Sequence, residues 1–229
     1  IVSIDILNEM FQHPEKANPK SFSETVLLNT HLKLLSQVQD KEAYQKVLNE
    51  VHQAQIESLQ QFNNNISLKN IINITERKGG FSLLMCRHYI KLKASQNLDN
   101  CWYQLGGMIQ MTNDLYDIYK DTVAGIHTFA NTQNTYENIL ENYEDQVNKF
   151  IESIHQLHYN KADKLKLQIK LSLITALGYI ALENLKILQG KNKELLPFKS
   201  YPRKDLIIDM EKIKNIIKMF KYSYQVAFK

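Results

Sequence analysis

Glycine and proline are scarce in this chain. Its 229 residues include 7 glycines and 4 prolines, and the prolines lie near the two ends, at Pro14, Pro19, Pro197 and Pro202. Because proline and glycine interrupt regular structure, the long middle of the chain lacks the usual helix breakers. A sustained alternation of apolar and polar residues, which is typical of strands, is also missing. The sequence therefore predicts an all-α protein with long helices.

Cysteine, long apolar runs and concentrated charge are also sparse. Cys86 and Cys101 are too few for a disulfide framework, and they indicate reduced, buried thiols in a cytoplasmic protein. The longest apolar run, LSLITALGYIAL, has roughly half of the ~20 residues that a membrane-spanning helix requires, so we expect no transmembrane segment. The net charge is only +4 and the lysines are scattered, which argues against binding to nucleic acid.

Apolar residues recur at positions i, i+3, i+4 and i+7 along most of the chain, which is the period of an amphipathic helix. The predicted helices cover residues 1–12, 21–38, 41–63, 67–93, 99–121, 133–159, 162–189 and 205–226. We expect one helical domain over residues 1–229, and the pattern leaves a homodimer open. The chain begins without methionine inside a helical pattern. We therefore expect a bundle that is truncated at its N-terminus.

The stretch QMTNDLYDIYKD, residues 110–121, places three aspartates among apolar residues. With Asn113 set at zero on a helical wheel, Asp117 lies at about 40°, Gln110 at about 60°, Asp121 at about 80° and Asp114 at about 100°. The rest of the circumference is almost entirely apolar, as expected of a buried helix. A solvated acidic face is the simpler alternative. It would require the polar stripe to face bulk water while the whole of the wide apolar arc packed against the core.

Carboxylates on a buried helix need a positive partner. Without one, each buried ion costs several kcal/mol and the acids take up protons instead. Ligands that offer only oxygen select hard cations, and Mg²⁺ commonly shares its coordination shell with substrate phosphates. The sequence therefore predicts a Mg²⁺–diphosphate site on this helix, with the metal held by Asn113, Asp114, Asp117 and Asp121.

The same residues resemble the second metal motif of a known family. NDLYD, residues 113–117, resembles the second aspartate-rich motif of prenyl diphosphate synthases, and residues 110–121 resemble the Q-x-T-N-x-x-x-D-x-x-x-D pattern of squalene and phytoene synthases. Asn113, Asp117 and Asp121, with Lys120 beside the last, are similar to the Asn/Ser/Glu triad of terpene cyclases. All three groups are class I isoprenoid synthases. The resemblance implies a helical bundle around a central cavity, in which Mg²⁺ assists the ionisation of an allylic prenyl diphosphate.

Upstream and downstream segments extend this resemblance over residues 21–190. HQAQIESL is similar to a G-Q-x-x-D helix of prenyl synthases, with Gln55 in the position that faces the cavity. SLKNIINITERKGGFSLL resembles their Y-x-x-I-x-x-x-K-T-x-x-L-F segment, in which Lys78 matches a lysine that binds diphosphate. KDTVAGIHT is similar to K-x-x-D-x-x-G-K-x-T, with His127 in place of a lysine.

The resemblance and the chemistry together assign roles. Diphosphate departs only if positive charge stabilises it, which Lys78 and neighbouring Arg77 can supply. Aromatic faces stabilise a carbocation. We therefore expect Lys78, Asp117 and Asp121 to be catalytic. The expected substrate-binding residues are Gln55, Arg77, Lys78, Phe81, Gln110, Tyr116 and Lys120.

Several features leave the reaction open. The first aspartate-rich motif of the family is missing, and Asp5 is a lone acid, so we expect that motif to lie before Ile1. Cyclisation of one substrate, chain elongation, head-to-head condensation and a non-catalytic helical partner subunit all remain. Arg203 and Lys204 are candidates for cations that close the site. The basic amphipathic segment 205–226 can lie on a membrane or a partner, although we expect it to pack on its own bundle.

Glycine appears twice within a predicted helix, at Gly79 and Gly80. Each costs roughly 1 kcal/mol of helix stability relative to alanine. We therefore expect the helix to pack closely against a neighbour, or to bend, at this point.

Overall fold

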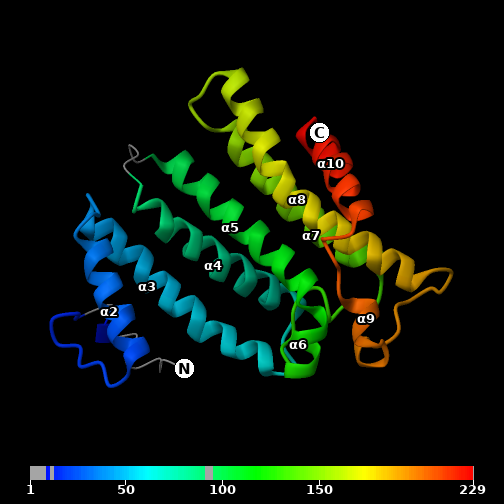
Figure 1. Ribbon diagram of the computed structural model, residues 1–229, viewed down its shortest axis with the longest axis horizontal. Helices are drawn as coiled ribbons and strands as arrows, with labels where there is room; N and C mark the ends of the chain where they lie inside the picture. Colours follow the sequence, from blue (N-terminus) through cyan, green and yellow to red (C-terminus); the bar gives the residue numbers. More distant parts are fainter. Residues whose placement is uncertain (1–8, 11–12, 91–94, 229) are drawn as a thin grey trace.

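The computed structural model describes residues 9–10, 13–90 and 95–228 of the chain. These residues form helices and no strands, which confirms the predicted all-α class (Figure 1). The α-helices are α2 (Phe22–Leu35), α3 (Lys41–Ser58), α4 (Leu68–Arg87), α5 (Gln96–Tyr116), α6 (Ile118–Ala124), α7 (Tyr136–His155), α8 (Lys161–Gln189), α9 (Arg203–Leu206) and α10 (Ile213–Ala227), with 3₁₀ helices η1 (Leu59–Phe62) and η2 (Phe198–Ser200). The predicted helix 1–12 falls mostly outside the described residues.

Short polar side chains set the starts of the long helices. In each case an Asn, Asp, Ser or Thr just before the first turn accepts a hydrogen bond from a backbone N–H two or three residues into the helix. These N-caps are Ser21, Asp40, Ser67, Ser95, Thr135 and Asn160. The helix boundaries therefore follow from local sequence.

The helices form an array with α5 in the middle (Figure 1). α3 packs on α4 and α4 on α5, while α7 and α8 pack on the other side of α5. α10 lies along α8, and α6 and α9 lie together at one end. The acid-bearing helix is thus the central one, as its apolar circumference predicts.

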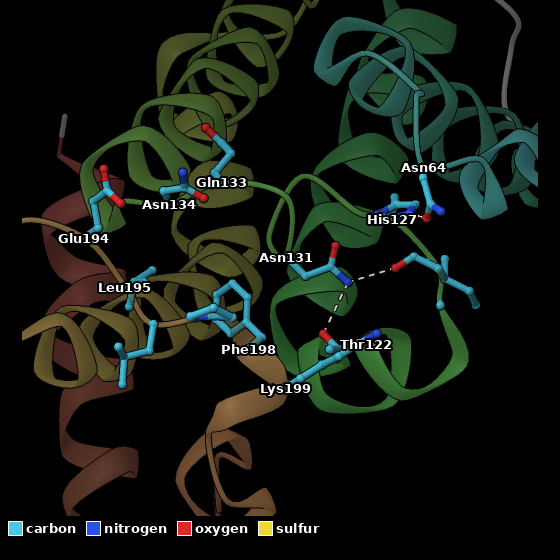
Figure 2. Close-up of a pocket in the computed structure, with 14 residues that line it drawn as sticks. Asn64, Thr122, His127, Asn131, Gln133, Asn134, Glu194, Leu195, Phe198 and Lys199 are labelled. Carbon is cyan, nitrogen blue, oxygen red and sulfur yellow. Dashed lines mark hydrogen bonds between the residues drawn. The ribbon is translucent and has the colours of Figure 1, made fainter.

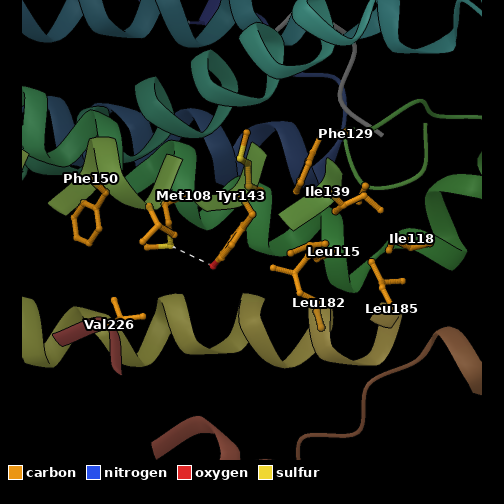
Figure 3. Close-up of a cluster of buried hydrophobic side chains, with 14 of the residues drawn as sticks. Met108, Leu115, Ile118, Phe129, Ile139, Tyr143, Phe150, Leu182, Leu185 and Val226 are labelled. Atoms are coloured by element: carbon orange, nitrogen blue, oxygen red, sulfur yellow. Dashed lines mark hydrogen bonds between the residues drawn. The ribbon is translucent and has the colours of Figure 1, made fainter. Parts of the chain in front are cut away.

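Most of the core lies between α5, α7 and α8 (Figure 3). Met108, Leu115 and Leu182 are almost fully buried there. The buried Tyr143 hydroxyl lies 3.0 Å from both the Thr175 carbonyl oxygen, to which it donates, and Thr112 Oγ1. A polar group thus reaches the centre of the core with its hydrogen bonds made, which keeps its burial from being costly.

Helices α4 and α5 meet backbone to backbone at a glycine contact. A Cβ atom added to Gly79 would collide with the Gly106 carbonyl oxygen, and one added to Gly106 would collide with the Gly79 carbonyl oxygen. Beside them, the Tyr103 ring covers Gly80. The close packing expected from Gly79 and Gly80 is therefore confirmed, and its partner is α5.

The structure corrects several predicted elements. The helix predicted over 99–121 is broken at Asp117, whose φ of −92° and ψ of 9° lie in the bridge region that ends α5 and precedes α6. The end of the predicted helix 41–63 tightens into η1, and the segment 205–226 divides into the end of α9 and α10. Cys86 was predicted to be buried, but it is exposed on α4, whereas Cys101 is buried, and both are free.

One helix among the described residues, α8, is long and apolar enough to cross a membrane by length and composition alone. In its most apolar window 44% of the residues are buried inside the protein, and it packs against α5, α7 and α10. A core helix has the same properties. The described part of the chain therefore contains no clear transmembrane segment.

The glycine contact predicts a contrast between two neighbouring substitutions. Gly106→Ala should lower the free energy of unfolding by about 2 kcal/mol or more, because its Cβ meets backbone that cannot move without separating the helices. Gly107→Ala should be nearly neutral, because its Cβ meets the end of the flexible Gln146 side chain and alanine favours the helix. Urea unfolding followed by circular dichroism measures both. Equal losses would show that the contact is not specific.

Candidate functional site

The site begins with Asp114, a buried carboxyl between α4 and α5. Its Oδ2 accepts a hydrogen bond from Thr75 Oγ1 at 3.3 Å, and its Oδ1 accepts one from Gln110 Nε2 at 3.0 Å. Gln110 lies one turn earlier on α5, and Thr75 comes from α4, which the glycine contact holds close. Both carboxyl oxygens are therefore occupied by partners inside the protein.

Burial changes the acidity of two of the three aspartates. Desolvation raises the pKa of Asp114 to about 7, an effect that the Gln110 hydrogen bond and the Lys78 charge oppose and the Asp121 charge increases. Desolvation likewise raises the pKa of Asp121 to about 6, with a further contribution from Asp117, while Lys120 and Lys78 lower it. Negative charge in this cluster is thus under-compensated.

The cations around these acids are arranged unevenly. Lys78, half-buried on α4, makes no ion pair within the described residues, yet its charge acts on both Asp114 and Asp121. Lys120 Nζ lies 3.1 Å from Asp117 Oδ2, with both side chains largely exposed. Such exposed pairs contribute little stability. The structure thus brings the predicted lysine of α4 to the predicted acids of α5 and α6.

Asp117 and Asp121 differ from Asp114 in what they contact. The Asp121 side chain is 9% exposed, and its carboxylate accepts no hydrogen bond from the described residues. Asp117 stands at the bend and is half-exposed, and Asn113, one turn earlier, is exposed. Among the described residues, the carboxylate oxygens at the bend are therefore bonded only by Lys120, whereas both oxygens of Asp114 have partners.

No group of three or more His, Cys, Asp and Glu side chains in the described ranges is close enough to hold a metal ion. The donor types at the bend, two carboxylates and one amide oxygen, match the preference of Mg²⁺. The bend directs Asp117 outward while Asp114 faces α4, so these acids are not gathered around one point. The chemistry of the donors fits Mg²⁺, and a bound ion would draw its remaining ligands from water or phosphate.

Other predicted site residues lie away from the acids. Gln55 is exposed on α3. The Arg77 guanidinium bonds the carboxylates of Glu50 and Glu57 on α3, each at 2.9 Å, and lies 5.3 Å from the centre of the Phe81 ring. Arg77 therefore links α4 to α3 instead of facing the acids.

Tyr116 lies on the side of α5 that faces α8. Its hydroxyl donates to the Leu177 carbonyl oxygen at 3.3 Å, and burial raises its pKa to about 12. Earlier on the same face come Leu105 and Ile109, which are half-buried. An apolar surface thus leads along α5 to the bend.

A pocket of about 540 Å³ opens beside the bend. Its lining is mostly apolar and aromatic, with two cations. The lining residues are Tyr116, Asp117, Tyr119, Lys120, Val123, Ala124, Arg203 and Ile207. The Arg203 guanidinium lies 5.7 Å from the centre of the Tyr119 ring. Arg203, which the sequence suggests as a closing cation, therefore lies in the same pocket as Asp117.

A second pocket, of about 450 Å³, lies between α6 and the segment 194–199 (Figure 2). Several of its amides bond the backbone: Asn131 Nδ2 donates to the Ile126 carbonyl oxygen at 2.8 Å, and Gln133 Nε2 to the Phe129 carbonyl oxygen at 2.9 Å. His127 Nε2 lies 3.0 Å from Asn64 Oδ1. The hydrogen bonds of these lining residues therefore anchor the loop that follows α6.

Sequence reasoning missed Thr75. It lies three residues before Lys78 and so on the same face of α4, which is a detectable signal once Lys78 is placed beside the acids. The hydrogen bond from Thr75 to Asp114, in contrast, depends on how α4 and α5 pack together, which no local sequence pattern shows.

The chain matches no protein-family model, no curated protein and no solved structure. Its function must therefore be inferred from its own residues and their geometry.

Asp114 predicts a pH-dependent stability. A carboxyl whose pKa is raised to about 7 in the folded protein binds a proton more tightly there than in the unfolded chain. The free energy of unfolding should therefore fall as pH rises from about 4 to 7. Asp114→Asn, which keeps a hydrogen-bonding amide in the same space, should reduce that slope and raise the melting temperature at pH 8 by a few degrees.

Thermal unfolding across this pH range, in parallel with Asp163→Asn, checks the prediction. Asp163 is exposed to solvent at the start of α8, so it provides a control for the same substitution at a solvated acid. A lower melting temperature for Asp114→Asn at pH 8 would contradict the prediction.

Proposed function

We propose that this protein is a Mg²⁺-dependent terpene or prenyl synthase that ionises an allylic prenyl diphosphate beside the bend between α5 and α6. The observation that carries the proposal is the acid cluster itself. Desolvation raises the pKa values of Asp114 and Asp121 in spite of Lys78, so their ionised forms would be stabilised by further positive charge. A divalent cation that arrives with a diphosphate group would supply it.

Asn113, Asp117 and Asp121 would hold the metal, at positions i, i+4 and i+8. Asp114 is a poorer ligand because Thr75 and Gln110 already bond its two oxygens. This division favours the squalene-like and cyclase-like pattern over the prenyl synthase pattern, in which Asp114 is a ligand. Bound Mg²⁺ would neutralise charge on the diphosphate as the carbon–oxygen bond breaks.

Positively charged side chains of this protein would also stabilise the diphosphate. Lys78 on one side of the cluster, and Lys120 and Arg203 at the pocket, can donate hydrogen bonds to phosphate oxygens. Held in place before the reaction, these donors stabilise the charge that develops on the leaving group. Lys120 would have to exchange its weak pair with Asp117 for the phosphate.

The prenyl chain would lie along the half-buried apolar face of α5, which carries Leu105, Ile109 and Tyr116. Apolar and aromatic side chains keep water away from a carbocation, and aromatic faces attract its charge. Tyr119, under the Arg203 guanidinium, lies near the same end of the pocket. The diphosphate and the prenyl chain thus have adjoining surfaces of suitable polarity.

Chain elongation is the nearest alternative reaction. It would need a further cationic site that binds isopentenyl diphosphate. Arg77 is the obvious candidate, but its guanidinium already binds Glu50 and Glu57. Ionisation of a single substrate therefore remains the preferred reaction. The absence of a three-acid cluster from the described residues instead favours a second candidate, a non-catalytic subunit that binds a prenyl chain.

Substitution of the acids separates these roles. Asp117→Ala and Asp121→Ala should each reduce Mg²⁺-dependent release of pyrophosphate from farnesyl diphosphate by about a hundredfold or more. Asp114→Ala should reduce it less, because its carboxyl is not a metal ligand in this assignment. Glu141→Ala, at an exposed acid of α7, is the control and should not change it.

Binding gives a readout that does not depend on turnover. Mg²⁺ with inorganic pyrophosphate should raise the melting temperature of the wild type but not of Asp117→Ala. A shift without turnover would identify the non-catalytic binder, and no shift at all would rule out the metal site.

The products decide between ionisation of one substrate and elongation. Farnesyl diphosphate alone should give hydrocarbons or alcohols, because a single allylic substrate suffices for ionisation and capture by water or cyclisation. Chromatography of extracted products with and without isopentenyl diphosphate measures this. Products that form only with both substrates would establish elongation.

A further inference from the structure

Helix α10 presents an apolar stripe outward. Four of its large side chains and the C-cap residue Phe228 are each between 60% and 75% exposed; the four are Ile213, Ile217, Phe220 and Tyr224. Helical geometry places them within about 80° of one another around the axis. The stripe is therefore continuous along the helix.

The opposite side of α10 carries the packing contacts. Ser223 Oγ lies 2.6 Å from Ser172 Oγ on α8, and Asn215, Val226 and Ala227 are buried. The predicted packing of this segment on its own bundle is thus correct. Packing does not account for the apolar stripe, however, because α8 is contacted by the other face.

A neighbouring strip of α8 extends the apolar surface. On α8, Ser172 contacts Ser223 of α10, and the Thr175 carbonyl oxygen accepts from Tyr143 of α7. Ile169 and Leu173, one turn apart and exposed, lie about 60° and 100° around α8 from Ser172, on the side away from Thr175. The apolar surface of α10 is therefore continued on α8 along the edge that faces away from α7.

Lysines border this surface on both sides. On α10, Lys214 and Lys221 follow the stripe around the helix, and on α8, Lys166 and Lys170 follow Ile169 and Leu173. All of these lysines are exposed, and Lys166 has only a long contact with Asp163. Residues 199–229 contain eight Lys and Arg against three Asp and Glu, a surplus of five in a chain whose net charge is +4.

We propose that α10 and the adjoining strip of α8 form a docking surface for an anionic lipid membrane. Large apolar side chains bordered by lysines suit the boundary between acyl chains and acidic headgroups, where the helix lies in the plane of the interface. The lysines attract the acidic headgroups of anionic lipids, and the apolar stripe inserts among the acyl chains. The proposal is independent of the proposed enzymatic function, because it uses none of the residues assigned to the acid cluster.

Sedimentation with phospholipid vesicles tests the proposal. The protein should sediment with vesicles of phosphatidylcholine and phosphatidylserine, less with pure phosphatidylcholine, and less at high salt. Ile217→Ser with Phe220→Ser, and separately Lys214→Glu with Lys221→Glu, should each reduce binding by about tenfold or more. Circular dichroism confirms that each variant folds.

The control for the position of the charge change is the double variant Lys33→Glu with Lys69→Glu. It makes the same change in net charge, but on α2 and α4. This control should retain most of the binding. A loss equal to that of the α10 lysine variant, or no sedimentation of the wild type, would overturn the proposal. So would a dimer in light scattering that the Ile217 and Phe220 substitutions abolish, because the surface would then bind a second copy.

Discussion

The close approach of α4 and α5 at Gly79 and Gly106 is the contact on which the candidate site depends. Backbone meets backbone there, so the two helices approach more closely than side chains would permit. Thr75 can then reach across to Asp114, and Lys78 comes near enough for its charge to affect two carboxyls. Without this contact Lys78 and the acids would lie on separate surfaces.

The buried acids are costly for the fold. Ionised Asp114 is desolvated near neutral pH, and its two neutral hydrogen-bond donors only partly offset the cost. A structure selected for stability alone would place an apolar residue between α4 and α5. Raised pKa values are instead typical of functional sites, and the neighbouring Asp117 lines the pocket beside the bend.

Sequence periodicity predicted most helices because it is a local signal, and the N-capping residues found in the structure are local as well. The bend at Asp117 could not be predicted in this way: it depends on the backbone torsions of one residue inside an otherwise helical pattern. The outward position of Gln55 and the pairing of Arg77 depend on how α3 packs on α4, with acids 20 and 27 residues distant in sequence. The residue types in the sequence thus predicted a cluster of acids with a nearby lysine, whereas helix packing decided which of the predicted residues lie together.

The bend at Asp117 also has a mechanical consequence. The Asp117 N–H still donates to the Asn113 carbonyl oxygen, and the Asp121 N–H to that of Asp117, both at 2.8 Å. These two hydrogen bonds span the bend, so they restrain the angle between α5 and α6 although the helix is interrupted there. The positions of Asn113 and Asp121 relative to each other are therefore set by the backbone torsions of one residue, Asp117. A substitution that changes those torsions would move the two side chains apart without altering either of them.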